Sequence, residues 1–434
     1  MKEITSNSPD EKEKSFSFSR RYSNYVLFIL TGVYVFNFID RQILVILQES
    51  IKKELGLTDT QLGLMSGFTF AIFYVSFGIP IARLADKRNR KNIITVSLML
   101  WSGMTAVSGL VQNFFQLLLA RIGVGIGEAG GSPPAHSILS DLFPPGRRAT
   151  AMAIYSTGIS MGILIGFLLG GWIDFYFGWR TAFFVVGIPG IIYALLLYFT
   201  VKEPLRGLSD NKTDIDETHS TKEVIVSLWR IPSFRYLSLA TGMAAYPAYT
   251  FSSWLPSFLA RTHGLKSNEI GYWLALSIGI GSGLGYFLGG YLADKMGRRD
   301  KRWYLWLPAA ALLTAIPFSL LVFFIPDTKA VLLLNGMVAF LLSIYLAPCI
   351  ALTHGLVKLR MRAMASAILF FILNIIGLGC GPLVTGMVSD HLKPTMGTDS
   401  IRWALSSALL INIIGAVLYF MAAKTIRQDL MKSK

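Results

Sequence analysis

Long apolar stretches recur along the whole chain, and each is about as long as a helix that crosses a lipid bilayer. Such a helix needs about 20 mostly apolar residues. The first six stretches lie at 22–46, 60–84, 91–112, 114–139, 148–176 and 181–201. The second six lie at 233–260, 268–294, 302–325, 329–355, 361–390 and 400–424. This pattern predicts an all-α membrane protein with twelve transmembrane helices.

The composition favours lipid over water as the main surroundings. Of the 434 residues, 53% are hydrophobic and only 15% are charged, whereas soluble domains carry about 25% charged residues. The formal net charge of +15 would also suit a nucleic-acid partner. The basic residues, however, form short clusters between the apolar stretches, which is how membrane proteins set their orientation. We therefore expect a lipid bilayer as a partner and no nucleic acid.

The distribution of charge also predicts the topology and the domains. Most of the 40 Lys and Arg residues lie in the termini and in every second loop, which predicts that both termini are cytoplasmic. We divide the chain into a polar tail (1–21), a six-helix bundle (22–201), a linker with an amphipathic surface helix (202–232), a second bundle (233–424) and a C-terminal tail (425–434). We expect a monomer that crosses the cell (inner or plasma) membrane many times.

Two sequence motifs occur once in each bundle. ADKRNRK (85–91) is repeated as ADKMGRR (293–299), and RATAMAI (148–154) as RAMASAI (362–368), at nearly the same offset. Both pairs begin on the side predicted to be cytoplasmic, so the two bundles are parallel, pseudo-symmetric repeats. Such repeats are found in transporters whose halves rock around a central substrate site.

The second copy of the first motif carries a family resemblance. Gly290 to Arg299 resembles the Gly-x-Leu-Ala-Asp-x-x-Gly-Arg-Arg/Lys pattern of the major facilitator superfamily, although the first copy has Ala82 and Asn89 in place of its two glycines. NFIDRQ (37–42) and RIGVGIGEAG (121–130) look like the Spinster subgroup, which is associated with sphingolipid and lysolipid movement. The resemblance implies a fold of two six-helix bundles that transports by alternating access.

Four ionisable residues fall inside predicted spans: Asp40, Arg41, Arg121 and Glu128. Each would cost about 2.5–3.5 kcal/mol near the bilayer centre if it faced lipid, so we expect all four to face the interior, where their formal charges cancel. We hypothesise a proton-coupling switch in which Asp40 and Glu128 compete for the two arginines. The alternative is a static cluster of ion pairs that fixes helix packing.

The resemblance also indicates where substrate binds, because helices 1, 4, 7 and 10 of this family line the cavity. The candidate substrate-binding residues are Arg41, Tyr246, Tyr249 and Tyr345. Each tyrosine could instead be a packed aromatic residue whose hydroxyl is satisfied. An aromatic cavity suits an amphipathic substrate, and a buried arginine suits an anionic head group.

The repeated motifs predict a cytoplasmic gate. Asp86 and Asp294 would each meet a helix N-terminus of the opposite half, and Arg90 and Arg298 would pair with acids across the interface when that side is closed. Alternatively, these charges serve only to set topology.

No motif in the chain predicts catalysis or a bound metal. HExxH and GxxxxGK[ST] are absent from the sequence, and Cys349 and Cys380 lie singly in apolar stretches, so we expect no enzyme activity, cofactor or metal. The leading hypothesis is a proton-coupled secondary active transporter of an amphipathic lipid or hydrophobic organic anion. The alternatives are a proton-coupled symporter of a small organic anion such as a sugar acid, and a channel or sensor.

Overall fold

The computed structural model describes residues 18–206, 221–357 and 361–432, and the regular elements in these ranges are all helices. The N-terminal half contains eight α-helices and one π-helical segment. They are α1 (Arg20–Leu55), α2 (Asp59–Gly63), η3 (Leu64–Phe68), α3 (Thr69–Lys87), α4 (Arg90–Ser108), α5 (Phe114–Glu128), α6 (Ser132–Leu142), α7 (Pro145–Phe177) and α8 (Trp179–Thr200).

A short helix, α9 (Thr221–Arg230), precedes the C-terminal half. The elements of that half are α10 (Pro232–His263), α11 (Ser267–Gly297), α12 (Trp303–Phe324), α13 (Thr328–Ser343), α14 (Leu346–Gly355), α15 (Arg362–Leu373), η5 (Asn374–Cys380), α16 (Gly381–Met396), η6 (Gly397–Asp399), α17 (Ser400–Ala408) and α18 (Leu410–Lys432).

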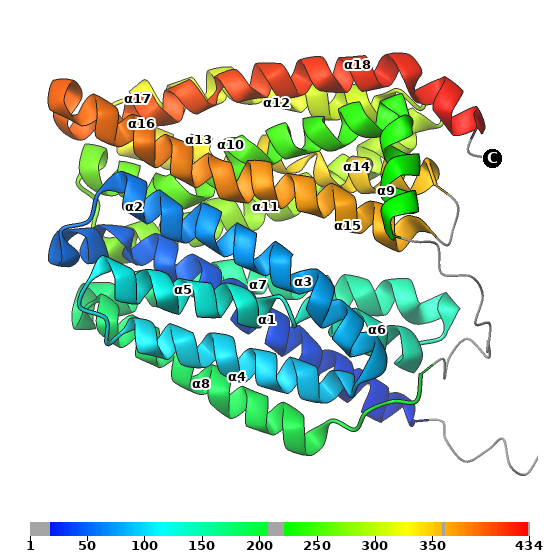
Figure 1. Cartoon of the computed structure of the whole chain (residues 1–434). Coiled ribbons are helices and arrows are strands. Elements are labelled where there is room, and N and C mark those ends of the chain that lie inside the picture. Colours follow the sequence, from blue (N-terminus) through cyan, green and yellow to red (C-terminus); the bar gives the residue numbers. More distant parts are fainter. Residues whose placement is uncertain (1–17, 207–220, 358–360, 433–434) are drawn as a thin grey trace, which may run out of the picture.

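The long helices lie side by side in two bundles, one from each half (Figure 1). In the N-terminal half α1 packs against α7, and α4 packs against α5 and α8. In the C-terminal half α10 packs against α18, and α11 against α13. The halves meet where α7 contacts α11, where α2 contacts α16, and where α1 contacts α10.

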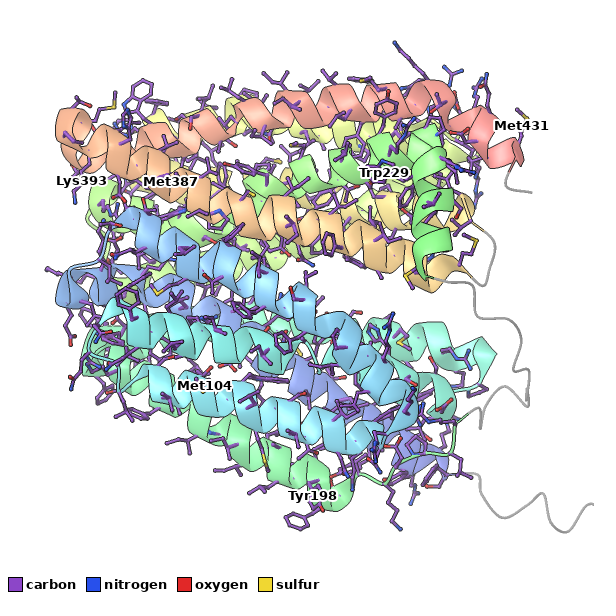
Figure 2. All side chains as sticks on the ribbon, viewed as in Figure 1. Met104, Tyr198, Trp229, Met387, Lys393 and Met431 are labelled. Atoms are coloured by element: carbon purple, nitrogen blue, oxygen red, sulfur yellow. The ribbon has the colours of Figure 1, made fainter. Side chains whose placement is uncertain are left out.

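Many large apolar side chains point away from the bundles, as lipid-facing helices require. Figure 2 shows Tyr198, Met387 and Met431 projecting outward, and each is well exposed. Eight stretches of the described residues are long and apolar enough to cross a membrane. The chain is therefore an all-helical protein with many membrane-spanning helices.

Each predicted span falls on one helix or on consecutive helices, but three are not among those eight stretches: 91–112, 114–139 and 233–260. α5 is only 15 residues long before it breaks, and α10 buries several Ser and Thr hydroxyls. At the C-terminus α18 continues to Lys432, beyond the predicted end of the last span at 424.

One long helix in each half is interrupted by a π-helical segment. η3 lies between α2 and α3, and η5 lies between α15 and α16, and the two π-helical segments contact each other across the interface. A Cβ added to Gly67 in η3 would lie 2.7 Å from the carbonyl oxygen of Leu378 in η5. π-Helical turns are rare and occur frequently at functional sites, and both of these lie at the interface between the halves.

Helix ends at one side of the molecule are fixed by local caps. Thr58 and Gln61 form a capping box that starts α2, and α1 and α10 end at Gly56 and Gly264, both with left-handed backbone. Glycine adopts that conformation without steric cost. The caps fix where α1 and α10 end and where α2 begins, at the side where α2 contacts α16 of the other half.

Candidate functional site

The four ionisable residues predicted to face the interior come together in the N-terminal half. α1 carries Asp40 and Arg41, and α5 carries Arg121 and Glu128. Asp40, Arg121 and Glu128 are each at most 2% exposed, and Arg41 is the partly accessible member. Two helices therefore supply two acids and two bases to one buried cluster.

Within the cluster, the direct ion pair joins Arg41 to Glu128. The Nε of Arg41 donates to Oε2 of Glu128 at 2.7 Å. Asn37, one turn before Arg41 on α1, lies beside the same carboxylate. Such a charge-assisted hydrogen bond is stronger than a neutral one, so this pair ties α1 to α5 in the conformation described.

Asp40 and Arg121 are neighbours without a direct bond. Each acts electrostatically on the other, yet within the described part of the chain no hydrogen bond reaches either oxygen of Asp40 or the Nε and Nη1 of Arg121. Thr105 of α4 lies next to Asp40, also without hydrogen-bond geometry. A buried charge without a partner is costly, so this part of the cluster is less well satisfied than the Arg41–Glu128 pair.

Aromatic rings surround the guanidinium of Arg41. Its Cζ lies 5.1 Å from the ring centre of Phe38, 4.8 Å from that of Phe70 and 5.1 Å from that of Tyr74. Cations are attracted to aromatic faces at such distances. Arg41 thus sits between Glu128 and a group of rings from α1 and α3.

Tyrosines of the C-terminal half face this group across the interface. Tyr249 of α10 is electrostatically coupled to Arg41 and Tyr74, and Tyr286 of α11 and Tyr345 continue the series beyond it. Tyr74 and Tyr286 were not predicted from the sequence. Tyr74 lies in the second predicted span (60–84) and Tyr286 in the eighth (268–294). We did not expect either span to line the cavity, so nothing in the sequence singled these residues out.

The predicted substrate-binding tyrosines do not all face Arg41. Tyr249 does, whereas Tyr246 is 7% exposed and its neighbours are Thr385 and Cys380 of the same half. The two tyrosines are three positions apart on α10, so they point in directions about 60° apart on the helix. Tyr345 lies deeper, beyond Tyr286.

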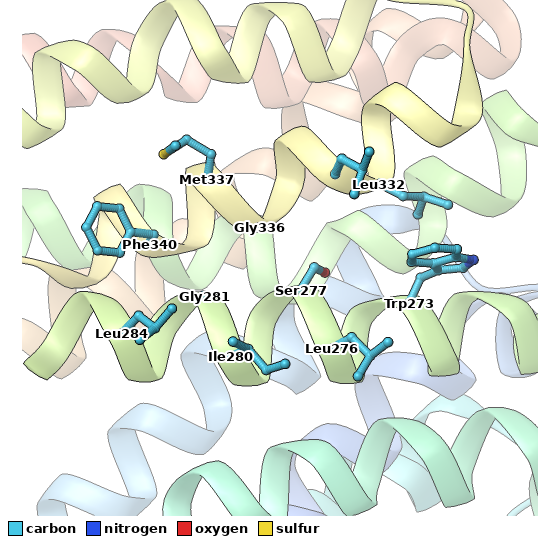
Figure 3. A pocket seen from close by; sticks show the side chains of 11 residues that line it. Trp273, Leu276, Ser277, Ile280, Gly281, Leu284, Leu332, Gly336, Met337 and Phe340 are labelled. Atoms are coloured by element: carbon cyan, nitrogen blue, oxygen red, sulfur yellow. The ribbon is translucent and has the colours of Figure 1, made fainter.

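An apolar surface groove lies away from this cluster. An apolar groove of about 500 Å³ separates α11 from α13 (Figure 3). Its exposed walls include Leu333 and Ile280, and its polar side chain Ser277 accepts a hydrogen bond from Asn335 at 2.8 Å. The groove belongs to the surface that faces lipid, and we assign it no chemistry.

The predicted cytoplasmic gate concerns the state in which that end is closed, so the conformation described here does not test it. Arg90 is 1% exposed and binds acids of its own half: its Nε donates to Glu203 at 2.7 Å, and its Nη1 forms an ion pair with Asp141. Arg90 therefore holds the segment after α8 against α4 and α6 in this conformation, because these carboxylates are nearer than any across the interface.

The other residues of that predicted gate form no described ion pair between the halves. Asp294 is exposed and accepts a hydrogen bond from Tyr304 of its own half at 2.6 Å. Arg298 is also exposed, and the side chain of Asp86 lies outside the described residues. The structure thus brings these four residues to one end of the bundles without joining the halves there.

Among the described residues, α7 and α11 approach each other most closely at one end of the bundles. A Cβ added to Gly171 of α7 would overlap the carbonyl of Ser267 in α11. Further along α11, a Cβ on Gly279 would lie 3.9 Å from Leu164, and one on Gly283 would meet no described atom within 4 Å. We call the first the closed end and the other, where α1 begins and α18 ends, the open end (Figure 1).

Comparison with known proteins agrees with this architecture. Residues 30–307 and 237–430 match the Major Facilitator Superfamily. An MFS-type efflux pump of Mycolicibacterium smegmatis is 34% identical over 93% of this chain and 93% of its own. The hexuronate transporter of Bacillus subtilis is 26% identical over 93% and 95%.

A solved structure gives the same result in three dimensions. It is the crystal structure of a bacterial homolog of the human lysosomal transporter Spinster, in an inward-facing and unoccupied conformation. It is 33% identical, covers 95% of this chain and 99% of its own, and superposes with a TM-score of 0.88. The chain therefore belongs to the Major Facilitator Superfamily, as a Spinster-like secondary transporter and not an enzyme.

Proposed function

We propose that this protein is a proton-coupled transporter that moves an amphipathic lipid or hydrophobic organic anion across the membrane by alternating access. The observation that carries the proposal is the position of Arg41. It joins the buried acid Glu128 at 2.7 Å and also stands among the aromatic rings at the interface. One residue thus connects the groups that can hold a proton with the surface that can hold a substrate.

Coupling follows from competition for Arg41. An anionic substrate that reaches the guanidinium displaces the Glu128 carboxylate, which then lies buried without its partner. A buried carboxylate that has lost its cation lowers its free energy by taking up a proton. Asp40 and Arg121, which make no direct bond to each other, supply a second acid and a second cation to the cluster. Their electrostatic interactions with Glu128 change when Glu128 takes up a proton. Binding of substrate and of protons are then linked.

The aromatic surroundings favour a substrate with a large apolar part. Tyr74 and Tyr249 come from opposite halves and both lie near Arg41. Their rings provide apolar surface, and their hydroxyls provide only a few hydrogen-bond partners. Pockets for apolar ligands are built in this way, with few polar groups that set orientation.

A small organic anion is the second candidate, because the hexuronate transporter of Bacillus subtilis is similar over almost the whole chain. A sugar acid would need hydroxyl-binding side chains as well as a cation. The tyrosine hydroxyls could supply them, and so could Asn37 beside Glu128.

We also propose an orientation. The basic loops and termini would be cytoplasmic, the membrane would be the cell (inner or plasma) membrane, and the open end would face the cytoplasm. The conformation described here would then be inward-facing, as the similar solved structure is. The functional unit would be one chain.

The test is substrate-dependent proton flux in liposomes that contain the purified protein and a pH-sensitive dye. We expect a lysolipid or sphingolipid with an anionic head group to drive proton movement that saturates with concentration. Proton movement driven only by sugar acids would favour the second candidate. Flux without saturation would indicate a channel, and no proton movement with any of these compounds would exclude proton coupling to them.

A further inference from the structure

A buried carboxylate at the closed end joins the two halves. Asp59 begins α2, and its side chain is completely buried. It accepts hydrogen bonds from Arg261 of α10, Nη1 to Oδ2 and Nη2 to Oδ1, both at 2.8 Å. Ser389 of α16 donates to Oδ2 at 2.7 Å, and Lys52 of α1 donates a fourth hydrogen bond. Two of these three partner residues come from the opposite half.

The partner arginine is itself held by a second acid. The Nε of Arg261 donates to Oε1 of Glu49 at 3.0 Å. Arg261 therefore reaches from α10 to two carboxylates of the N-terminal half, one on α1 and one on α2. The planar guanidinium suits such a paired arrangement better than an ammonium would.

A reciprocal contact runs from the C-terminal half to the N-terminal half. Asp390 of α16 accepts hydrogen bonds from the backbone N–H of Asp59 at 3.0 Å and of Thr60 at 2.7 Å, and from the Thr60 hydroxyl at 2.7 Å. Each half thus presents a carboxylate to the other. Hydrogen bonds of this group therefore link Glu49, Asp59 and Thr60 of the N-terminal half with Arg261, Ser389 and Asp390 of the C-terminal half.

Backbone packing around the group requires the halves to be in contact. A Cβ added to Gly386 of α16 would overlap the carbonyl of Asp59, and one added to Gly63 would overlap the carbonyl of Pro382. The ion pair is therefore dry only while the halves touch. If this end opened, water would reach Asp59 and Arg261, and the strength of their interaction would fall because water screens charges far better than a protein interior does.

We propose that the Asp59–Arg261 pair is the gate of the closed end, which sets how often that end opens during transport. The two charges are paired only while the halves touch. The pair therefore stabilises the closed state and is absent from the open one. This proposal depends on alternating access, which is part of the proposed function, but it does not depend on the substrate or on proton coupling.

The experiment measures distances between spin labels across each end of the purified protein. In a background with Cys349→Ala and Cys380→Ala, one label pair replaces the exposed residues Phe115 and Lys393 near the closed end. A second pair replaces Tyr198 and Lys424 near the open end. Pulsed electron paramagnetic resonance then gives the fraction of molecules open at each end, without substrate.

We expect Arg261→Gln and Asp59→Asn to raise the ratio of open to closed molecules at the closed end by about tenfold or more, the size that a few hydrogen-bonded charges can produce. The distance between the two labels of the second pair, at the open end, should shorten in the same samples. Arg261→Lys, which keeps the charge without the planar fork, should give a smaller shift.

Arg180→Gln is the matched control. Arg180 binds Glu54 at 2.9 Å at the same end of the molecule, but both residues belong to the N-terminal half. It should leave both distance distributions unchanged. Unchanged distributions in folded Arg261→Gln and Arg261→Lys would overturn the gate. A shift in protein that moves no protons would uphold the gate and reject the coupling proposed above.

Discussion

The two halves share a fold but differ in what their central helices bury. α1 and α5 of the N-terminal half bury two acids and two arginines. The corresponding helices of the C-terminal half, α10 and α13–α14, have no charged residue within 236–260 or 330–353, and they carry Tyr249 and Tyr345 instead. Since buried charge is costly unless it is paired, its restriction to these two helices leads us to expect a division of labour in the proposed mechanism: the N-terminal half would respond to protons, and the C-terminal half would contribute aromatic surface.

The strongest test of this division removes the acid of the direct ion pair. Glu128→Gln would leave Arg41 near the interface without its carboxylate. We expect proton-driven transport in liposomes to fall about 100-fold or more, because removing one partner of a buried ion pair costs about 3–5 kcal/mol. Glu54→Gln, an exposed acid of the same half, is the control and should keep full transport. Normal proton-driven transport by Glu128→Gln would place coupling elsewhere.

Asp40→Asn tests whether the second acid carries a proton or only packs. We expect accumulation driven by a pH gradient to fall about tenfold, the scale of one lost charge interaction, while exchange of substrate between two equal pools continues, because exchange needs no net proton movement. Asp327→Asn, at the cap of α13 in the C-terminal half, should change neither measurement. If Asp40→Asn kept the pH dependence of the unaltered protein, the cluster would be a structural ion-pair network.

Tyr249→Phe tests the contribution of the C-terminal half. Loss of one hydroxyl that faces substrate should weaken apparent affinity by about 2- to 10-fold, since a net hydrogen bond contributes about 0.5–1.5 kcal/mol. The number of protons moved per substrate should not change. Tyr419→Phe is the matched control, because that hydroxyl is fully buried and contacts Cys349 within the C-terminal half. A changed proton ratio in Tyr249→Phe would contradict the division between the halves.

Hydropathy could predict the helices but not how they are broken. The cost of charge in lipid was enough to predict that Asp40, Arg121 and Glu128 would be buried. The π-helical turns at η3 and η5 depend on two backbones approaching across the interface, and no local sequence pattern encodes that approach.

The sequence also could not predict which charged residues form ion pairs with each other. Arg41 and not Arg121 bonds to Glu128, because the directions of side chains on two packed helices decide it. At the closed end, Asp59 and Arg261 lie near the ends of predicted spans, where charge is ordinary. Only their burial in the fold separates them from residues that merely set orientation.

The smallest expected effect concerns polar groups that the C-terminal half buries for packing alone. Asn335 of α13 donates to Ser277 of α11 at 2.8 Å. Such a bond between membrane helices contributes about 0.6 kcal/mol on average and at most about 1.7 kcal/mol. Asn335→Ala should therefore lower the thermal unfolding midpoint slightly while leaving proton flux and apparent affinity unchanged. A loss of coupling in this variant would mean that the C-terminal half also takes part in the proton response, and the division between the halves would have to be abandoned.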